Sequence, residues 1–426
     1  MAKATKTRYC YAFEEGDGTN KKLLGGKGAG LCTMTQIGLP VPPGFVITTE
    51  ANIEYLEGGD KFPDGLMDEV HEYMEALEKK TGKGFGDPSK PLLVSVRSGS
   101  ALSMPGMMDT ILNLGLNDET AKGMIALTKN ERFVNDAYRR FLQLFGKIGL
   151  GIPDAEFDKI FDEVKEKYHA HVDTELTAEA LAEVVQKFKD VIKRITGKPF
   201  PQDPWAHLFL SMEGVFKSWM GKRAVDYRRQ FNITKELAYG TAVNICTMVF
   251  GNMGNDSATG VGFTRDPGTG ENKLYGDYLI NAQGEDVVAG IRATKPLEQL
   301  ADDLPEMYDQ FAAIAARLER HYREMQDMEF TVERGKLWIL QTRAGKRTAQ
   351  AAVRIAVDLA DEGLITREEA VMRVKPDQVD FFLHPQFSAE SLKGAVKLAK
   401  GLNVSPGAAV GIAAFDPDVA ERWAKV

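Results

Sequence analysis

The stretch Asp327-Met-Glu-Phe-Thr-Val-Glu-Arg-Gly-Lys-Leu-Trp-Ile-Leu-Gln-Thr-Arg343 decides the fold class of this 426-residue chain. Every second residue from Met328 to Val332 is apolar, and Glu329 and Thr331 between them are polar. This two-residue period is typical of a strand with one apolar and one polar face. Arg334-Gly335 then favours a turn, after which Leu337–Thr342 returns as the partner strand. The stretch therefore predicts a two-faced β-hairpin.

The length of the turn decides which side chains share the polar face. A three-residue loop centred on Gly335 pairs Glu329 with Gln341, whereas a two-residue turn places Leu340 opposite Glu329. The first register gathers a carboxylate and an amide oxygen, with Arg343 two residues further along. Such oxygen ligands suit Mg²⁺ bound jointly with nucleotide phosphates. The alternative is a polar hairpin with an incidental ion pair.

Around this hairpin, strand-like and helical segments follow one another, which predicts an α+β fold. Leu92–Val96 and Gly44–Thr48 are strand-like, and strand-like sequence resumes at Ala242–Phe250. Residues 117–204 carry apolar stripes at helical spacing, which predicts a helical insertion with Thr177 as one N-cap. Helices are also expected over 297–325 and after residue 343, where Thr366-Arg-Glu-Glu369 fits a capping box.

Composition limits the classes of function. A net charge of −8 argues against nucleic-acid binding, which depends on neutralising phosphates. The three cysteines, Cys10, Cys32 and Cys246, have no metal-ligand spacing and predict reduced thiols. The sequence has no apolar run of membrane-spanning length and no secretory signal, so we expect a cytoplasmic protein.

Two glycine-rich or basic segments could bind an anion. In Gly25-Gly-Lys-Gly28, a lysine lies inside a glycine cluster before a predicted helix, whose free N–H groups could contact phosphate. A plain turn with a solvated lysine is equally consistent. Arg97 ends an apolar strand, where its guanidinium could bridge phosphate oxygens or pair with a carboxylate. The glycines of Thr259-Gly-Val-Gly262 indicate either close approach of a ligand or another backbone, or a bulge.

Taken together, these segments resemble the pyruvate, phosphate dikinases. The resemblance extends from about Tyr11 to Gly411, and the Met-Pro-Gly-Met-Met-Asp-Thr loop separates the chain from phosphoenolpyruvate synthases and glucan, water dikinases. The motifs that carry it are Leu23-Leu-Gly-Gly-Lys-Gly28, Ser95-Val-Arg-Ser-Gly99, Ser103–Asn117, Tyr278–Gly290, Gln326–Phe330 and Gln341-Thr-Arg343.

The resemblance implies an ATP-grasp-like nucleotide-binding region of two lobes that holds ATP with Mg²⁺. It implies that Lys27 and Arg97 hold phosphates and that Arg343 stabilises charge on the transferring group, with Arg97 and Arg343 as catalytic residues. Glu329 and Gln341 would bind the metal. The remaining implied ATP-site residues are Ser103, Met104, Gly106, Thr110, Thr259, Gly260, Glu285 and Asp327.

The same resemblance divides the chain. We expect a first lobe over 1–116 and 205–241, the insertion over 117–204, a second lobe over 242–343 and a helical linker over 344–404. Ser405–Gly411 resembles the start of a swivelling domain, over 405–426, without that domain's Thr-Ser-His motif. We therefore expect this chain to lack two partner domains, the swivelling phosphohistidine domain and the pyruvate/phosphoenolpyruvate barrel. The parent enzyme is expected to be a homo-oligomer.

Three hypotheses remain open from the sequence. The chain is the ATP-binding and phosphoryl-donor half of a dikinase, or a stand-alone module that binds ATP without turnover. The third is phosphotransfer to a small molecule, as in related antibiotic phosphotransferases, against which the Ser103–Thr110 loop argues.

Overall fold

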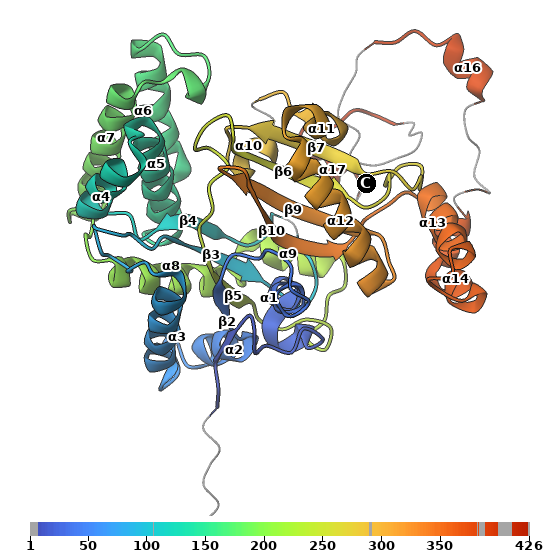
Figure 1. Cartoon of the computed structure of the whole chain (residues 1–426), viewed down its shortest axis with the longest axis horizontal. Helices are drawn as coiled ribbons and strands as arrows, with labels where there is room; N and C mark the ends of the chain where they lie inside the picture. The colour runs from blue at the N-terminus through green and yellow to red at the C-terminus, as the bar shows by residue number, and fades with distance from the viewer. Residues whose placement is uncertain are drawn as a thin grey trace, which may run out of the picture. The chain divides into compact units, whose positions relative to one another are not determined.

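A computed structural model describes residues 7–104, 106–288, 292–380, 382, 388–398 and 411–424. The described chain divides into two compact units, the larger comprising Met1–Thr264 and Leu274–Gly345 and the smaller Arg265–Lys273 and Lys346–Val426. Helices and strands occur together in the larger unit, which confirms the α+β class (Figure 1).

The first sheet of the larger unit has five antiparallel strands in the order β1-β2-β5-β3-β4. Its strands are β1 (Cys10–Ala12), β2 (Gly44–Ile47), β3 (Val94–Gly99), β4 (Thr110–Leu114) and β5 (Ala242–Thr247). The expected domain division places residues 242–247 at the start of the second lobe, but β5 lies in the centre of this first sheet. Its two partners come from far upstream, so a local apolar pattern could not assign it to a sheet.

The second sheet also has five strands, in the order β10-β9-β6-β7-β8. Its strands are β6 (Ala258–Phe263), β7 (Tyr275–Ile280), β8 (Lys295–Pro296), β9 (Gln326–Glu333) and β10 (Lys336–Ala344). One face is apolar: Met328, Phe330 and Val332 of β9 are fully buried, and Phe330 packs against Phe311. This confirms the two-faced strand predicted from the sequence.

Helices cover the sheets and form the expected insertion. Those that contact the first sheet are α1 (Lys21–Gln36), α2 (Thr49–Glu57), α3 (Leu66–Thr81) and α8 (Pro204–Ser218). The short helix α9 (Lys222–Gln230) follows α8. Figure 1 shows the insertion helices together, and they are α4 (Asp118–Thr128), α5 (Glu131–Ile148), α6 (Asp154–Lys167) and α7 (Ala178–Thr196). The Thr177 side chain accepts a hydrogen bond from Ala180 N, which confirms the predicted N-cap of α7.

The second sheet carries α10 (Gly284–Val288), α11 (Leu300–Asp303) and α12 (Pro305–Tyr322).

The side chains of β5 separate two apolar cores. Val243 and Ile245 pack with the core under α2, α3 and the insertion, whereas Ala242 and Cys246 pack with α1. The first sheet is therefore covered on both faces, and the face toward α1 is the one that continues into the second sheet's core.

The smaller unit contains α13 (Ala349–Asp361), α14 (Arg367–Arg373), α15 (Pro376–Asp380), α16 (Ala389–Lys393) and α17 (Pro417–Ala424). The predicted capping box is present, because Thr366 and Glu369 each bind the other's backbone N–H. Fully buried Arg265 is held by Glu362, just after α13. The segment 405–410, expected to begin a swivelling domain, lies outside the described residues.

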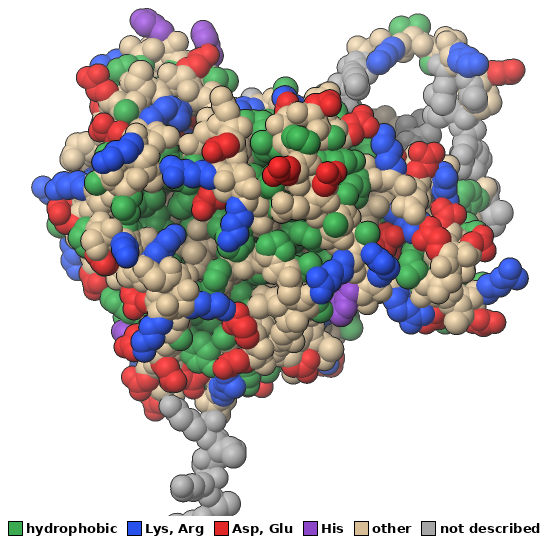
Figure 2. All heavy atoms as spheres, in the orientation of Figure 1, with side chains coloured by type: hydrophobic (Ala, Val, Ile, Leu, Met, Phe, Trp, Pro, Cys, Tyr) green, Lys and Arg blue, Asp and Glu red, His purple; other side chains and the backbone are tan. Residues whose placement is uncertain are grey.

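Three general findings bear on function. Within the described chain, no helix is both long and apolar enough to cross a membrane. Lys and Arg side chains are interspersed with Asp and Glu over the face shown in Figure 2. All three cysteines are buried free thiols.

Candidate functional site

The polar face of the β9–β10 hairpin brings four predicted site residues together. Glu329 lies opposite Gln341, and Asp327 lies opposite Arg343. Nε of Arg343 donates to Oδ2 of Asp327 over 2.7 Å. Asp327 and Gln341 are buried, at 7% and 8% exposure, whereas the Arg343 side chain is 37% exposed. Two carboxylates, an amide and a partly accessible guanidinium therefore share one surface of the sheet.

This pairing arises from a β-bulge rather than from the expected loop length. The turn has two residues, Arg334 and Gly335, both with positive φ (47° and 72°), as a type I′ turn requires. Of the two alternatives left open by the sequence, the two-residue turn is the one observed, but it does not place Leu340 opposite Glu329. The ladder shifts by one residue between Ile339 and Gln341, so Leu340 is extra and Gln341 still faces Glu329.

Arg97 of β3 joins this face from the first sheet. Its Nη2 donates to Oε2 of Glu329 over 2.8 Å, and its Nη1 donates to the carbonyl oxygen of Leu340 over 3.2 Å. The Arg97 side chain is 13% exposed and that of Glu329 is 32% exposed, so water screens this pair only in part. The carbonyl of the bulged residue thus helps to hold the guanidinium.

Lys27 reaches the same region from α1 because this helix is kinked. Gly25 has φ 68° and ψ 163°, so the helix restarts after it and Lys27 lies in the new first turn. A Cβ on Gly25 would lie 2.0 Å from the carbonyl oxygen of Gly99, so only glycine fits here. Gly26 N donates to Ser100 O over 2.8 Å, which fixes the turn on the end of β3.

These groups lie close enough to shift one another's pKa values. Burial and the positive charge of Arg97 lower the pKa of Lys27 to about 7. Burial would raise the pKa of Glu329, but the charges of Arg97, Lys27 and Arg343 outweigh it and hold the pKa below its usual value. Three basic side chains therefore surround the ionised Glu329, and a second carboxylate, Asp327, pairs with Arg343. When Lys27 is protonated, the cluster keeps an excess positive charge that favours the binding of an anion.

Thr259 and Gly260 lie in β6, next to β9. The Thr259 hydroxyl is buried, and it donates to the carbonyl oxygen of Phe330 over 3.1 Å. A Cβ on Gly260 would lie 2.7 Å from both the Asp277 carbonyl oxygen and the Phe330 ring. The pairing of β6 is continuous, so close packing explains this glycine and a bulge does not.

The loop from Ser103 to Thr110 meets the site only at its end. Thr110 begins β4 and lies opposite Arg97. Met104 is buried against Trp219, away from the hairpin's polar face. Arg223 of α9 donates to Gly106 O over 3.2 Å and to Asp109 Oδ1 over 3.1 Å. The structure therefore holds Met104 and Gly106 against the α8–α9 region, and Ser103 is exposed.

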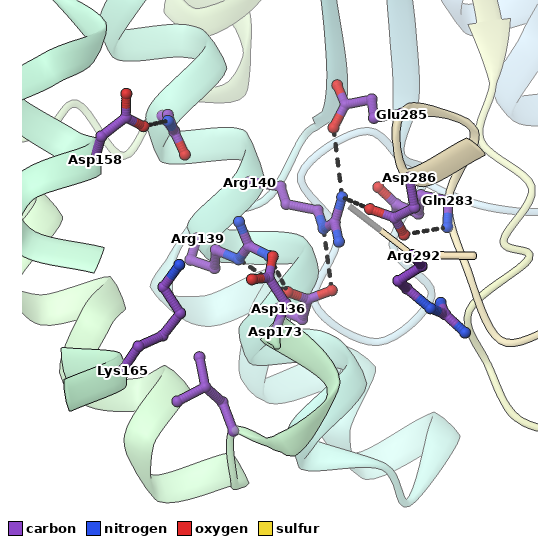
Figure 3. A network of polar contacts seen from close by, with 12 residues as sticks. Asp136, Arg139, Arg140, Asp158, Lys165, Asp173, Gln283, Glu285, Asp286 and Arg292 are labelled. Atoms are coloured by element: carbon purple, nitrogen blue, oxygen red, sulfur yellow. Dashed lines mark hydrogen bonds and ion pairs between the residues drawn. The ribbon is translucent and has the colours of Figure 1, made fainter. Parts of the chain in front are cut away.

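Glu285 belongs to a different charge network, which Figure 3 shows. Nη1 of Arg140 lies 3.5 Å from Glu285 Oε2 and 2.9 Å from Asp286 Oδ1, and its Nε lies 3.1 Å from Asp136 Oδ2. Burial raises the pKa of Glu285 despite Arg140. Within the described chain, no hydrogen bond or ion pair joins Glu285 to Arg97 or Glu329. This network ties α10 to α5 of the insertion.

Sequence reasoning missed Asn244 of β5, which is fully buried and donates from Nδ2 to the carbonyl oxygen of Arg97 over 3.1 Å. A polar residue in the middle of the apolar run Ala242–Phe250 was a signal that could have indicated it. Arg140 and Asp136 were missed as well, because charged residues on a helix are ordinarily solvated.

Comparison with known proteins defines the class. The family model for the pyruvate phosphate dikinase AMP/ATP-binding domain matches residues 21–61, 58–302 and 294–363, which include Lys27, Arg97 and the hairpin. The chain is 58% identical over 417 residues to a pyruvate, phosphate dikinase of Entamoeba histolytica, covering 97% of this chain and 47% of that protein.

Two further relatives agree. The dikinase of Clostridium symbiosum is 51% identical over 415 residues (97% of this chain, 47% of that protein), and the chloroplastic dikinase of Flaveria trinervia is 52% identical over 409 residues (96% and 43%). The chain belongs to the pyruvate, phosphate dikinase family. It spans about half the length of the relatives that it matches.

Proposed function

We propose that this chain binds MgATP in an ATP-grasp-like site between its two sheets and serves as the phosphoryl-donor part of a dikinase. The observation that supports this most directly is the convergence of Lys27, Arg97 and Arg343 around Glu329. Two of these cations face carboxylates, Arg97 with Glu329 and Arg343 with Asp327, so a protonated Lys27 provides the excess positive charge for a triphosphate. Arg97 offers a planar fork that suits phosphate oxygens.

The residues present fit a magnesium ion. Within the described chain, no group of three or more His, Cys, Asp or Glu could hold a metal. Mg²⁺ needs fewer protein ligands, since it is ordinarily bound by one or two carboxylates together with substrate phosphates and water. Glu329 and Gln341 supply neighbouring hard oxygens. When bound there, Mg²⁺ would neutralise charge on the phosphate oxygens.

Glu329 can serve the metal without losing Arg97. Its Oε2 accepts from Arg97, and an ionised carboxylate has further lone pairs on both oxygens. Arg97 can then turn one nitrogen toward phosphate while it keeps the Leu340 carbonyl. Lys27, near the end of the glycine-rich turn, would hold phosphate in its protonated form.

In the proposed reaction, a histidine nitrogen of a separate swivelling domain attacks the β-phosphorus of ATP. The bond from that phosphorus to the α,β-bridging oxygen breaks, and AMP leaves with the electron pair. Arg343, whose side chain is more exposed than that of Arg97, would stabilise charge on the transferring group. Thr110 and Thr259-Gly260 would line the triphosphate site, and the rest of the Ser103–Thr110 loop would cover it after leaving Arg223. Asp327 would orient Arg343, and Glu285 would join the site by leaving Arg140.

In the complete reaction proposed for the family, inorganic phosphate accepts one phosphoryl group to give pyrophosphate, and the remaining phosphohistidine moves to a barrel domain and phosphorylates pyruvate there. The test is transfer in trans. The chain is mixed with an excised swivelling domain of a full-length relative, Mg²⁺ and ATP labelled in the β-phosphate. Label on that domain's histidine together with AMP release supports the proposal.

Binding of ATP without transfer, both in this mixture and when the chain is fused to the swivelling domain, would instead indicate a module that binds ATP without turnover. Failure to bind MgATP at all would overturn the proposed site.

A further inference from the structure

Asn244 occupies a place where an apolar residue would be expected. It lies in the middle of β5, opposite Arg97 on β3 and Val46 on β2, and its side chain is fully buried. Ala242 and Cys246, which face the same side of the strand, pack in an apolar core. Burying an amide in such surroundings is unfavourable unless its polar atoms are paired.

Only one end of the amide is paired within the described part of the chain. Nδ2 donates to the carbonyl oxygen of Arg97 over 3.1 Å, whereas Oδ1 is buried without a hydrogen-bond partner among the described residues. A leucine has nearly the same branched shape and would remove the unpaired acceptor. Leucine would also lose the hydrogen bond to the Arg97 carbonyl, so the gain and the loss in stability oppose each other, and stability alone does not explain the asparagine.

The amide also packs against the chain segments that carry both proposed phosphate-binding cations. A Cβ on Gly28 would lie 2.9 Å from Asn244 Oδ1. A Cβ on Gly99 would lie 3.0 Å from Asn244 Nδ2 and 3.2 Å from the Cβ of Lys27. The two glycines leave room for the Asn244 amide, which lies directly against the turn that presents Lys27 and against the peptide of Arg97.

We propose that Asn244 is a positioning residue that sets the separation and orientation of Lys27 and Arg97 for the phosphates of ATP. Nδ2 fixes the Arg97 peptide, and Oδ1 lies against Gly28 in the turn next to Lys27. The inference rests on the proposed function. Asn244 touches neither phosphate nor metal in this role, and it acts through the two cations.

The test compares Asn244→Leu with a matched control on the same strand. Thr247 of β5 also has a buried hydroxyl without a partner among the described residues, but it lies opposite Val94 rather than Arg97. Thr247→Val therefore removes an unpaired buried atom without touching the cations. For each variant, urea unfolding gives stability, and calorimetry gives the affinity for MgATP and for adenosine.

Asn244→Leu should leave the urea midpoint unchanged or raised and weaken MgATP binding at least tenfold, with adenosine affinity unchanged. Thr247→Val should leave all three quantities unchanged or raise only stability. Equal losses of MgATP and adenosine affinity would indicate a general distortion and overturn the proposal, as would wild-type MgATP affinity in Asn244→Leu.

If Asn244→Leu does not fold, Asn244→Ala replaces it, because alanine adds no atoms to the core. A selective loss of MgATP affinity over adenosine affinity in Asn244→Ala then supports the role of Asn244, and wild-type MgATP affinity overturns it. Wild-type chain that fails to bind MgATP overturns the proposed function itself. A wild-type chain that binds and a leucine variant that binds equally well overturns only the role of Asn244.

Discussion

Glu329→Gln tests the metal site most directly, because it removes a charge and keeps the shape of the side chain. The Glu329 carboxylate accepts a hydrogen bond from Arg97 Nη2 over 2.8 Å, and its side chain is about one-third exposed. A hydrogen bond to a charged group contributes about 1.5–3 kcal/mol, and partial screening reduces this to about 1–2 kcal/mol here. The free energy of unfolding of the nucleotide-free chain should fall by that amount.

The effect on ligands should depend on the metal. Without Mg²⁺, ATP should bind Glu329→Gln as well as wild type or better, because a negative charge beside the triphosphate is gone. With Mg²⁺, affinity should fall about tenfold or more, about 1.4 kcal/mol, because the ion loses an anionic ligand. Calorimetric titration with and without Mg²⁺ separates the two effects.

Glu333→Gln is the matched control. Glu333 lies on the same strand and face, and its carboxylate accepts from Phe250 N over 2.7 Å, remote from Arg97 in the strand register. This variant should keep the full effect of Mg²⁺ on ATP binding. If Glu329→Gln also kept it, Glu329 would be a structural partner of Arg97 and the metal assignment would be refuted.

Three further predictions test other parts of the chain. Arg343→Ala should leave ATP affinity within roughly tenfold, about 1.4 kcal/mol, while nearly abolishing transfer in trans, and a collapse of binding would make Arg343 a ground-state anchor. MgATP affinity should fall as pH rises from 7 to 9, because the pKa of Lys27 is about 7 and phosphate binds the protonated lysine better. In Lys27→Met, a plot of MgATP affinity against pH should be flat over this range. Gly25→Ala should lower stability by more than the roughly 1–3 kcal/mol expected for a strained backbone, because its φ is 68° and its Cβ would meet Gly99 O at 2.0 Å. Gly38→Ala is the control, because Gly38 has a φ of 76° but open space around its Cβ position. In urea unfolding it should lose only the stability expected for backbone strain, and an equal loss in Gly25→Ala and Gly38→Ala would contradict the predicted clash with Gly99 O.

Local patterns predicted local structure well. The alternation from Met328 to Val332 gave a strand with the predicted buried face. Thr177 and Thr366 cap helices as predicted. These features depend on residues within about one helical turn or strand repeat of one another, so the sequence contains the whole physical cause.

Features that depend on distant segments were less predictable. β5 lies between β2 and β3, and its apolar residues would suit a central strand in either sheet. Its sheet therefore could not be assigned from the sequence. Asn244 shows the same limit, because its importance depends on Gly28 and Gly99, which only the fold brings to it.

The hairpin combines the shorter of the two turns considered from the sequence with the side-chain pairing expected of the longer one. Glu329 and Gln341 do face each other, but through a two-residue turn and a bulge at Leu340. Leucine fits a regular strand as well as a bulge, so no residue type marks the extra position. The bulge also offers the Leu340 carbonyl to Arg97, which is 243 residues away in sequence. A regular two-residue hairpin would turn Gln341 and Arg343 toward the apolar face, so the bulge both keeps these side chains on the polar face and supplies part of the support for Arg97.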